Sequence, residues 1–91
     1  MVRLRVDPGY ERALDRLPKA IRQRSNAALL KFLENPRSPG LNFEKLRDRA
    51  DYYSIRVNLQ YRILLRLEAD REGELFAVVD VGTHQVYRRR R

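Results

Sequence analysis

The stretch YYSIRVNLQYRILLRL, from Tyr52 to Leu67, gives the clearest indication of the fold because it contains two alternating segments joined by a short polar turn. Tyr53, Ile55 and Val57 alternate with polar side chains, and apolar residues alternate again after the turn. Successive side chains of a strand point to opposite faces of a sheet. The stretch therefore predicts two antiparallel strands with one buried face.

A third strand is predicted directly after this pair. The polar run ADREGE, residues 69–74, is typical of a hairpin loop. Alternation resumes at 75–81, where we expect Leu75, Ala77, Val79 and Val81 on one face and Phe76, Val78 and Asp80 on the other. Consecutive strands with such short connections predict a largely antiparallel sheet.

The chain before this meander predicts one strand and two helices. Residues 2–6 alternate as a short strand, and Asp7 with Pro8 forms a typical helix start. Apolar residues at helical spacing continue to Leu17, where Pro18 separates the first helix from a second. The stripe of the second helix comprises Ile21, Ser25, Ala28, Leu29, Phe32 and Leu33, and the helix stops at Asn35-Pro36.

These elements predict a single α+β domain over residues 1–91. A helical hairpin covers one face of a four-stranded sheet, which is built from the N-terminal strand and a three-strand antiparallel meander. Residues 36–51 carry no convincing helix or strand pattern. The uncovered face is expected to display Ser54, Arg56, Arg62 and Arg66.

Charge is the strongest global feature of the chain. Twenty basic residues against twelve acidic ones give a net charge of +8, and lysine occurs only at 19, 31 and 45. Arginine-rich surfaces favour nucleic acid or an acidic protein as a partner. The absence of cysteine and the single histidine argue against a metal site, and no cofactor is expected. Without an export signal or an apolar run of membrane-spanning length, we expect a cytoplasmic protein with no membrane partner.

Several polar residues are candidates for chemistry, each with a plainer alternative. Arg56 and Arg62 on neighbouring strands suit a phosphate clamp, or they form part of a solvated sheet face. His84 lies just past the third strand, where it can act as a general acid or be simply exposed. Tyr87 can share a helical turn with His84 or pack at the core edge, and Glu44 is a possible general base or an ordinary surface carboxylate.

The element order, the stretch 52–67 and the closing VGTHQVYRR resemble the RelE/ParE toxin superfamily of type II toxin–antitoxin systems over essentially the whole chain. Members of the RelE, YoeB and HigB type are ribosome-dependent mRNA endonucleases that inhibit translation. The resemblance implies that activity, an acidic and partly disordered antitoxin as partner in a hetero-oligomer, and ribosome-bound mRNA as target.

The resemblance also implies roles for individual residues. Arg62 matches the arginine that contacts the scissile phosphate, and Glu44 lies near the position of the general-base glutamate. His84 matches the general acid and Tyr87 the tyrosine that stacks on the substrate base. RNA contacts are expected from a wider set that comprises Ser54, Arg56, Arg66, Arg88 and Arg89.

Two other functions remain open at this point. ParE-like members of the superfamily share the fold but inhibit DNA gyrase, and a third possibility is a non-catalytic member that only binds an antitoxin. Ser54 stands where RelE has a lysine, and the arginines of 88–91 extend beyond the point where YoeB ends. These four arginines are expected to attract ribosomal RNA at long range rather than to reach the reaction centre.

Overall fold

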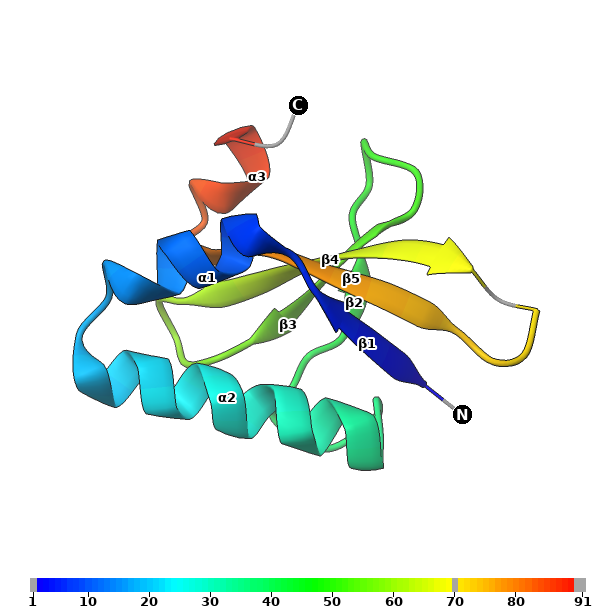
Figure 1. The fold of residues 1–91 in the computed structure, drawn as a ribbon, viewed down its shortest axis with the longest axis horizontal. Helices are drawn as coiled ribbons and strands as arrows, with labels where there is room; N and C mark the ends of the chain where they lie inside the picture. The colour runs from blue at the N-terminus through cyan, green and yellow to red at the C-terminus, as the bar shows by residue number, and fades with distance from the viewer. Residues whose placement is uncertain (1, 70, 90–91) are drawn as a thin grey trace.

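A computed structural model describes residues 2–69 and 71–89, apart from the side chains of Arg88 and Arg89. The terminal arginines at 90 and 91 lie outside the described residues. The elements in chain order (Figure 1) are β1 (Arg3–Val6), α1 (Pro8–Asp15), α2 (Lys19–Glu34), β2 (Glu44–Lys45), β3 (Tyr52–Arg56), β4 (Arg62–Ala69), β5 (Leu75–Gly82) and α3 (Val86–Arg89).

The helix boundaries follow the capping chemistry of the sequence. The Asp7 carboxylate accepts a hydrogen bond from the Gly9 amide at 3.0 Å, with Pro8 in the first turn of α1. The carbonyl of Pro18, just before α2, accepts hydrogen bonds from the amides of Ile21 and Arg22. The predicted start of the first helix and both bounds of the second are confirmed, whereas α1 ends at Asp15 and not at Leu17 as the apolar stripe indicated. In the described part of the chain, no helix has both the length and the apolar character needed to cross a membrane.

The sheet has five strands in the order β1-β5-β4-β3-β2, so the expected number of four is wrong. The meander β3-β4-β5 is antiparallel as predicted, and β1 pairs with β5 in parallel. The additional strand β2 consists only of Glu44 and Lys45, paired with Ser54 and Tyr53 of β3. Two exposed polar residues carry no alternation, and therefore the sequence gives no signal for this edge strand.

One face of the sheet is covered by both long helices, as predicted. Phe32 of α2 contacts Phe43 and Phe76 edge to face, with ring centroids 4.9 and 5.5 Å apart. Tyr53 of β3 stacks on Phe43 at 5.3 Å. We call this packed side the helix-side core; its buried members are Tyr10, Ala28, Leu29, Phe32, Leu41, Ile55, Val57, Ile63, Leu65, Phe76, Val78 and Val81.

The opposite face is not the open polar surface that the sequence suggested. It carries a small buried cluster, the far-side cluster, made of Leu64, Ala77, Val79 and Val86. A register shift in β5 pairs Leu64 with Asp80 and Leu65 with Val78, which interrupts the alternation at Val79. Val81 therefore joins the helix-side core and not the face of Ala77 and Val79, because a bulge adds one residue to the strand.

Candidate functional site

A hollow of about 590 Å³ opens where the β3–β4 loop approaches the turn after β5. It is of the size typical for ligand sites. We call it the His84 pocket; its lining consists of Glu44, Leu59, Gln60, Arg62, Thr83, His84 and Tyr87. The fold thus brings all four residues proposed as catalytic to one hollow, although they come from three separate segments of the chain: β2, the start of β4, and the turn that follows β5.

His84 and Tyr87 are placed by a turn anchored on the far-side cluster. The amide of Tyr87 donates to the His84 carbonyl at 3.2 Å, and that of Val86 donates to Thr83 at 3.0 Å. Val86 is completely buried, while His84 is exposed and Tyr87 is half-buried against the same cluster. Tyr87 therefore shares a helical turn with His84, and Val86 fixes that turn to the sheet.

Arg62 begins β4 and is half-buried, with its guanidinium held by main-chain carbonyls. Its Nη1 donates to the carbonyl of Asn58 at 2.8 Å and to that of Tyr61 at 3.2 Å. Among the residues that the structure describes, no carboxylate forms an ion pair with Arg62, so these carbonyl acceptors leave its positive charge uncompensated there. Such a fixed cation at the rim of a hollow is suited to stabilising an anion, and a phosphate is the natural candidate.

Glu44 reaches the pocket from the edge strand β2, where its side chain is exposed. Its Oε1 accepts a hydrogen bond from Nδ2 of Asn42 at 3.2 Å. Asn42 has a φ of 49°, in the left-handed region that asparagine tolerates better than most residues. A carboxylate, a guanidinium, an imidazole and a phenol thus line the same hollow, which supplies groups for base, charge-stabilising, acid and stacking roles.

The wider set of RNA-binding candidates is not gathered at this pocket. Ser54 is only 3% exposed, so the expectation that the sheet face displays it is wrong. It lies between Glu44 of β2 and Leu64 of β4, and burial by both neighbouring strands covers it. The side chains of Arg88 and Arg89 lie outside the described residues.

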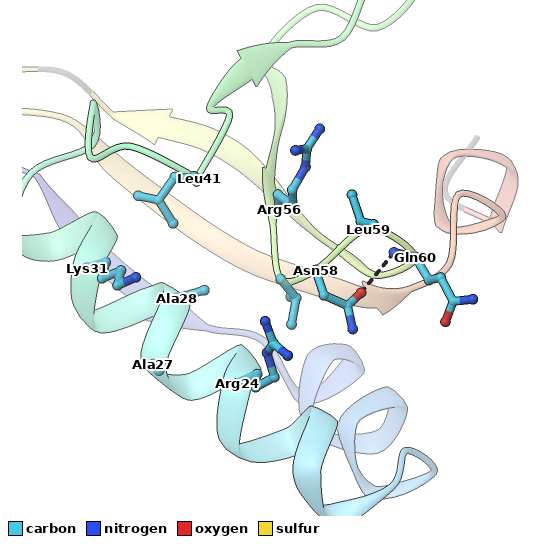
Figure 2. A pocket seen from close by; sticks show the side chains of 11 residues that line it. Arg24, Ala27, Ala28, Lys31, Leu41, Arg56, Asn58, Leu59 and Gln60 are labelled. Atoms are coloured by element: carbon cyan, nitrogen blue, oxygen red, sulfur yellow. Dashed lines mark hydrogen bonds between the residues drawn. The ribbon is translucent and has the colours of Figure 1, made fainter.

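Arg56 and Arg66 also lie apart from the His84 pocket. Arg56 lines a second hollow of about 650 Å³, the α2 hollow, together with Arg24 and Lys31 of α2 (Figure 2). Arg66 donates to Glu68 at 2.7 Å, and Arg5 of β1 binds the same carboxylate at 2.8 Å. The expected single arginine face is therefore divided among three places, which are the His84 pocket, the α2 hollow and the Glu68 carboxylate.

Three residues of the pocket lining were missed by sequence reasoning. Leu59 and Gln60 lie in the β3–β4 loop and Thr83 in the turn after β5. Loop residues carry no periodic pattern, so only their proximity in the fold associates them with the pocket. The one available signal was Asn58, a residue type that often closes turns through its side chain.

Comparison with known proteins places the chain beside bacterial and archaeal toxins. The family model for the ParE-like toxin domain matches residues 19–89. The match spans α2, the whole meander and α3. No curated protein sequence gives a significant match.

Solved structures reproduce the fold at low sequence identity. A YoeB/ParE toxin from Agrobacterium tumefaciens superimposes with a TM-score of 0.70 at 17% identity, covering 90% of this chain and 98% of that one. A RelB–RelE antitoxin–toxin complex from Methanococcus jannaschii gives 0.67 at 19% identity, covering 94% and 98%. A variant of E. coli toxin RelE in the free state gives 0.67 at 24% identity, covering 94% and 86%.

Proposed function

Because the chain belongs to the ParE-like toxin domain family, we propose that it is the toxin of a type II toxin–antitoxin system and that it cleaves mRNA on the ribosome. The convergence of Glu44, Arg62, His84 and Tyr87 on one pocket is the observation that carries this proposal. A purely binding domain has no need of a potential base, cation and acid around the same hollow.

The proposed reaction is an attack of a ribose 2′-hydroxyl on the adjacent phosphate. Glu44 takes the proton of the 2′-hydroxyl while its oxygen forms the new bond to phosphorus. His84 gives a proton to the 5′-oxygen as the bond between that oxygen and phosphorus breaks. The products are a 2′,3′-cyclic phosphate and a free 5′-hydroxyl, and the need for a 2′-hydroxyl restricts the reaction to RNA.

Arg62 and Tyr87 have roles in binding and charge stabilisation. The Arg62 guanidinium balances the negative charge that grows on the phosphate oxygens in the transition state. Tyr87 offers a half-buried ring on which a base of the message can stack. His84 and Glu44 are exposed, so the RNA and the ribosome have to supply the geometry that the open pocket does not impose.

The proposed partner in the resting cell is an acidic, partly disordered antitoxin. The net charge of +8 favours electrostatic capture of such a chain. RelB–RelE complexes among the structural neighbours support a toxin–antitoxin hetero-oligomer. Ribosome and mRNA complete the set of proposed partners, which places the activity in the cytoplasm.

A second candidate function is inhibition of DNA gyrase. The description of the matching family as ParE-like favours this possibility. On this alternative, the His84 pocket is not a reaction centre, and substitution of His84 leaves toxicity unchanged.

Two assays on the purified protein separate these functions. A translation reaction with a defined message, followed by primer extension, tests for cuts in ribosome-bound mRNA. A supercoiling assay tests gyrase inhibition. We expect cuts that require the ribosome, cyclic phosphate ends and normal supercoiling. Intact message together with blocked supercoiling would replace the first proposal by the second.

A further inference from the structure

The position of the Arg62 guanidinium depends on the loop that precedes it. Both carbonyls that accept from its Nη1 belong to this loop, at Asn58 and Tyr61. The Tyr61 carbonyl is itself fixed, because it also accepts the amide of Val57 at 2.9 Å. The direction of the guanidinium is therefore set by the shape of residues 57–61.

The side chain of Asn58 closes this loop. Its Oδ1 accepts hydrogen bonds from the amides of Gln60 and Tyr61, both at 2.8 Å. Figure 2 shows the bond to Gln60 at the edge of the α2 hollow. An asparagine that accepts from amides two and three residues ahead replaces the main-chain bonds of an ordinary turn. Asn58 thus holds the loop in shape through its side chain, and it holds the Arg62 guanidinium through its main-chain carbonyl.

Packing contributes little at the tip of this loop, although Val57 at its start is buried in the helix-side core. Leu59 is 85% exposed, and Gln60 is exposed as well. A loop tip without buried side chains has low local stability, so its hydrogen bonds determine its conformation. The two bonds to Oδ1 of Asn58 are therefore the main restraint on the two residues between Asn58 and Tyr61.

The restraint matters because Arg62 lies directly opposite another cation, Arg56, on the neighbouring strand. Arg56 and Arg62 are direct cross-strand partners, and like charges in that relation repel each other. The two side chains diverge. Arg56 lines the α2 hollow, where Figure 2 shows it extending away from Asn58, whereas Arg62 lines the His84 pocket. The loop carbonyls hold Arg62 on the pocket side.

We propose that Asn58 is a positioning residue for Arg62, which it keeps aimed into the His84 pocket through the closed 57–61 loop. The consequence for catalysis rests on the proposed mRNA cleavage, whereas the consequence for the order of the Arg62 side chain does not. Asn58 itself lines the α2 hollow, so its role is exerted through Arg62.

Three variants test this inference in the full-length protein. Asn58→Ala removes the Oδ1 acceptor, and Asn58→Asp keeps an acceptor oxygen at the same place. Asn35→Ala is the matched control, because Oδ1 of Asn35 also accepts an amide two residues ahead, from Arg37 at 3.0 Å. Asn35 ends α2 and contributes to neither hollow in the described part of the chain.

Two measurements separate positioning from general stability. The first is single-turnover cleavage at saturating ribosomes, together with ribosome affinity. We expect Asn58→Ala to slow cleavage by about 10- to 100-fold, the scale of a misplaced catalytic group, with affinity unchanged. Asn58→Asp should restore most of the rate, and Asn35→Ala should cleave as the wild type does.

The second measurement is ¹⁵N NMR of the Arg62 side chain in the free protein, with exchange rates of the Gln60 and Tyr61 amides. Asn58→Ala should make the Arg62 signal mobile and both amides fast to exchange, unlike the other two variants. Normal order of Arg62 in Asn58→Ala, or a normal cleavage rate, overturns the inference. If the wild type cuts no ribosome-bound RNA, the proposed function fails, and the NMR comparison still decides whether Asn58 holds Arg62.

Discussion

The two faces of the sheet are stabilised in different ways. On the helix side, Phe32, Phe43, Tyr53 and Phe76 form a network of ring contacts at centroid distances between 4.9 and 5.8 Å. On the far side, the buried cluster is small, and the guanidinium of Arg62 is held by hydrogen bonds to loop carbonyls. The helix side therefore supplies stability, while the far side leaves polar groups accessible for chemistry. Four substitutions test this contrast between the two faces, in order of decreasing expected effect.

Phe32→Ala should have the largest effect because it opens a cavity in the middle of the helix-side core. Phe32 is completely buried and contacts two other rings. We expect a loss of about 3–5 kcal/mol in the free energy of unfolding, close to the stability of a small domain. Thermal unfolding measures it, with Leu30→Ala as control, since Leu30 lies on the same helix and is 62% exposed. Equal losses for both variants would contradict the assigned core.

Arg62→Ala should affect activity and not stability. We expect cleavage at saturating ribosomes to fall by about 100- to 1,000-fold, the scale of a lost transition-state donor. The control is Arg22→Ala, because Arg22 is another half-buried arginine whose Nη1 donates to a carbonyl, that of Leu17. Both variants should melt within a few degrees of each other. Aggregation of Arg62→Ala alone would mean that Arg62 is structural.

Val86→Ala tests whether the far-side cluster serves the pocket. The truncation removes about 1–2 kcal/mol of buried apolar contact, and it also loosens the turn that carries His84 and Tyr87. Val78→Ala is the control in the helix-side core, since Val78 is equally buried. We expect a similar loss of stability from both, but slower single-turnover cleavage only for Val86→Ala. Equal rates would show that α3 needs no anchor.

Glu68→Gln should have the smallest effect, and its effect should depend on pH. Hydrogen bonds from Arg5 and Arg66 lower the pKa of Glu68 to about 2. A lowered pKa stabilises the folded state above the unfolded pKa, and this contribution is lost as the pH falls through the folded pKa. Because the bridge is partly exposed and screened, we expect no more than about 1 kcal/mol at neutral pH.

Urea unfolding between pH 7 and pH 2 checks the Glu68 prediction. The stabilities of the wild type and Glu68→Gln should converge as the pH approaches 2. Glu72→Gln serves as control, because Glu72 is an exposed glutamate of the β4–β5 loop. A difference that persists at pH 2 would assign the effect to packing instead of charge.

Local patterns predicted most of the fold. The caps at Asp7 and Pro18, the apolar stripe of α2 and the alternation of 52–67 give the elements and the face that each one buries, because these signals depend only on neighbours along the chain. The two residues of β2 and the bulge at Val79 were missed, since neither leaves a periodic trace. The resemblance to toxins of known fold singled out Glu44, Arg62, His84 and Tyr87 one by one.

How these residues come together depends on the three-dimensional packing of the chain. Alternation states which face a side chain takes, but not which strand ends and loops lie together. Glu44 of β2 and His84 after β5 line one pocket although β3 and β4 lie between their strands. The structure also buried Ser54, paired Arg66 with Glu68 and placed Arg56 in the lining of the α2 hollow. Composition determined that the chain is basic. The packing of distant segments determined that Arg62 is the arginine that lines the pocket. This placement matters because a charge acts on groups that are near it in space, whether or not they are its neighbours along the sequence.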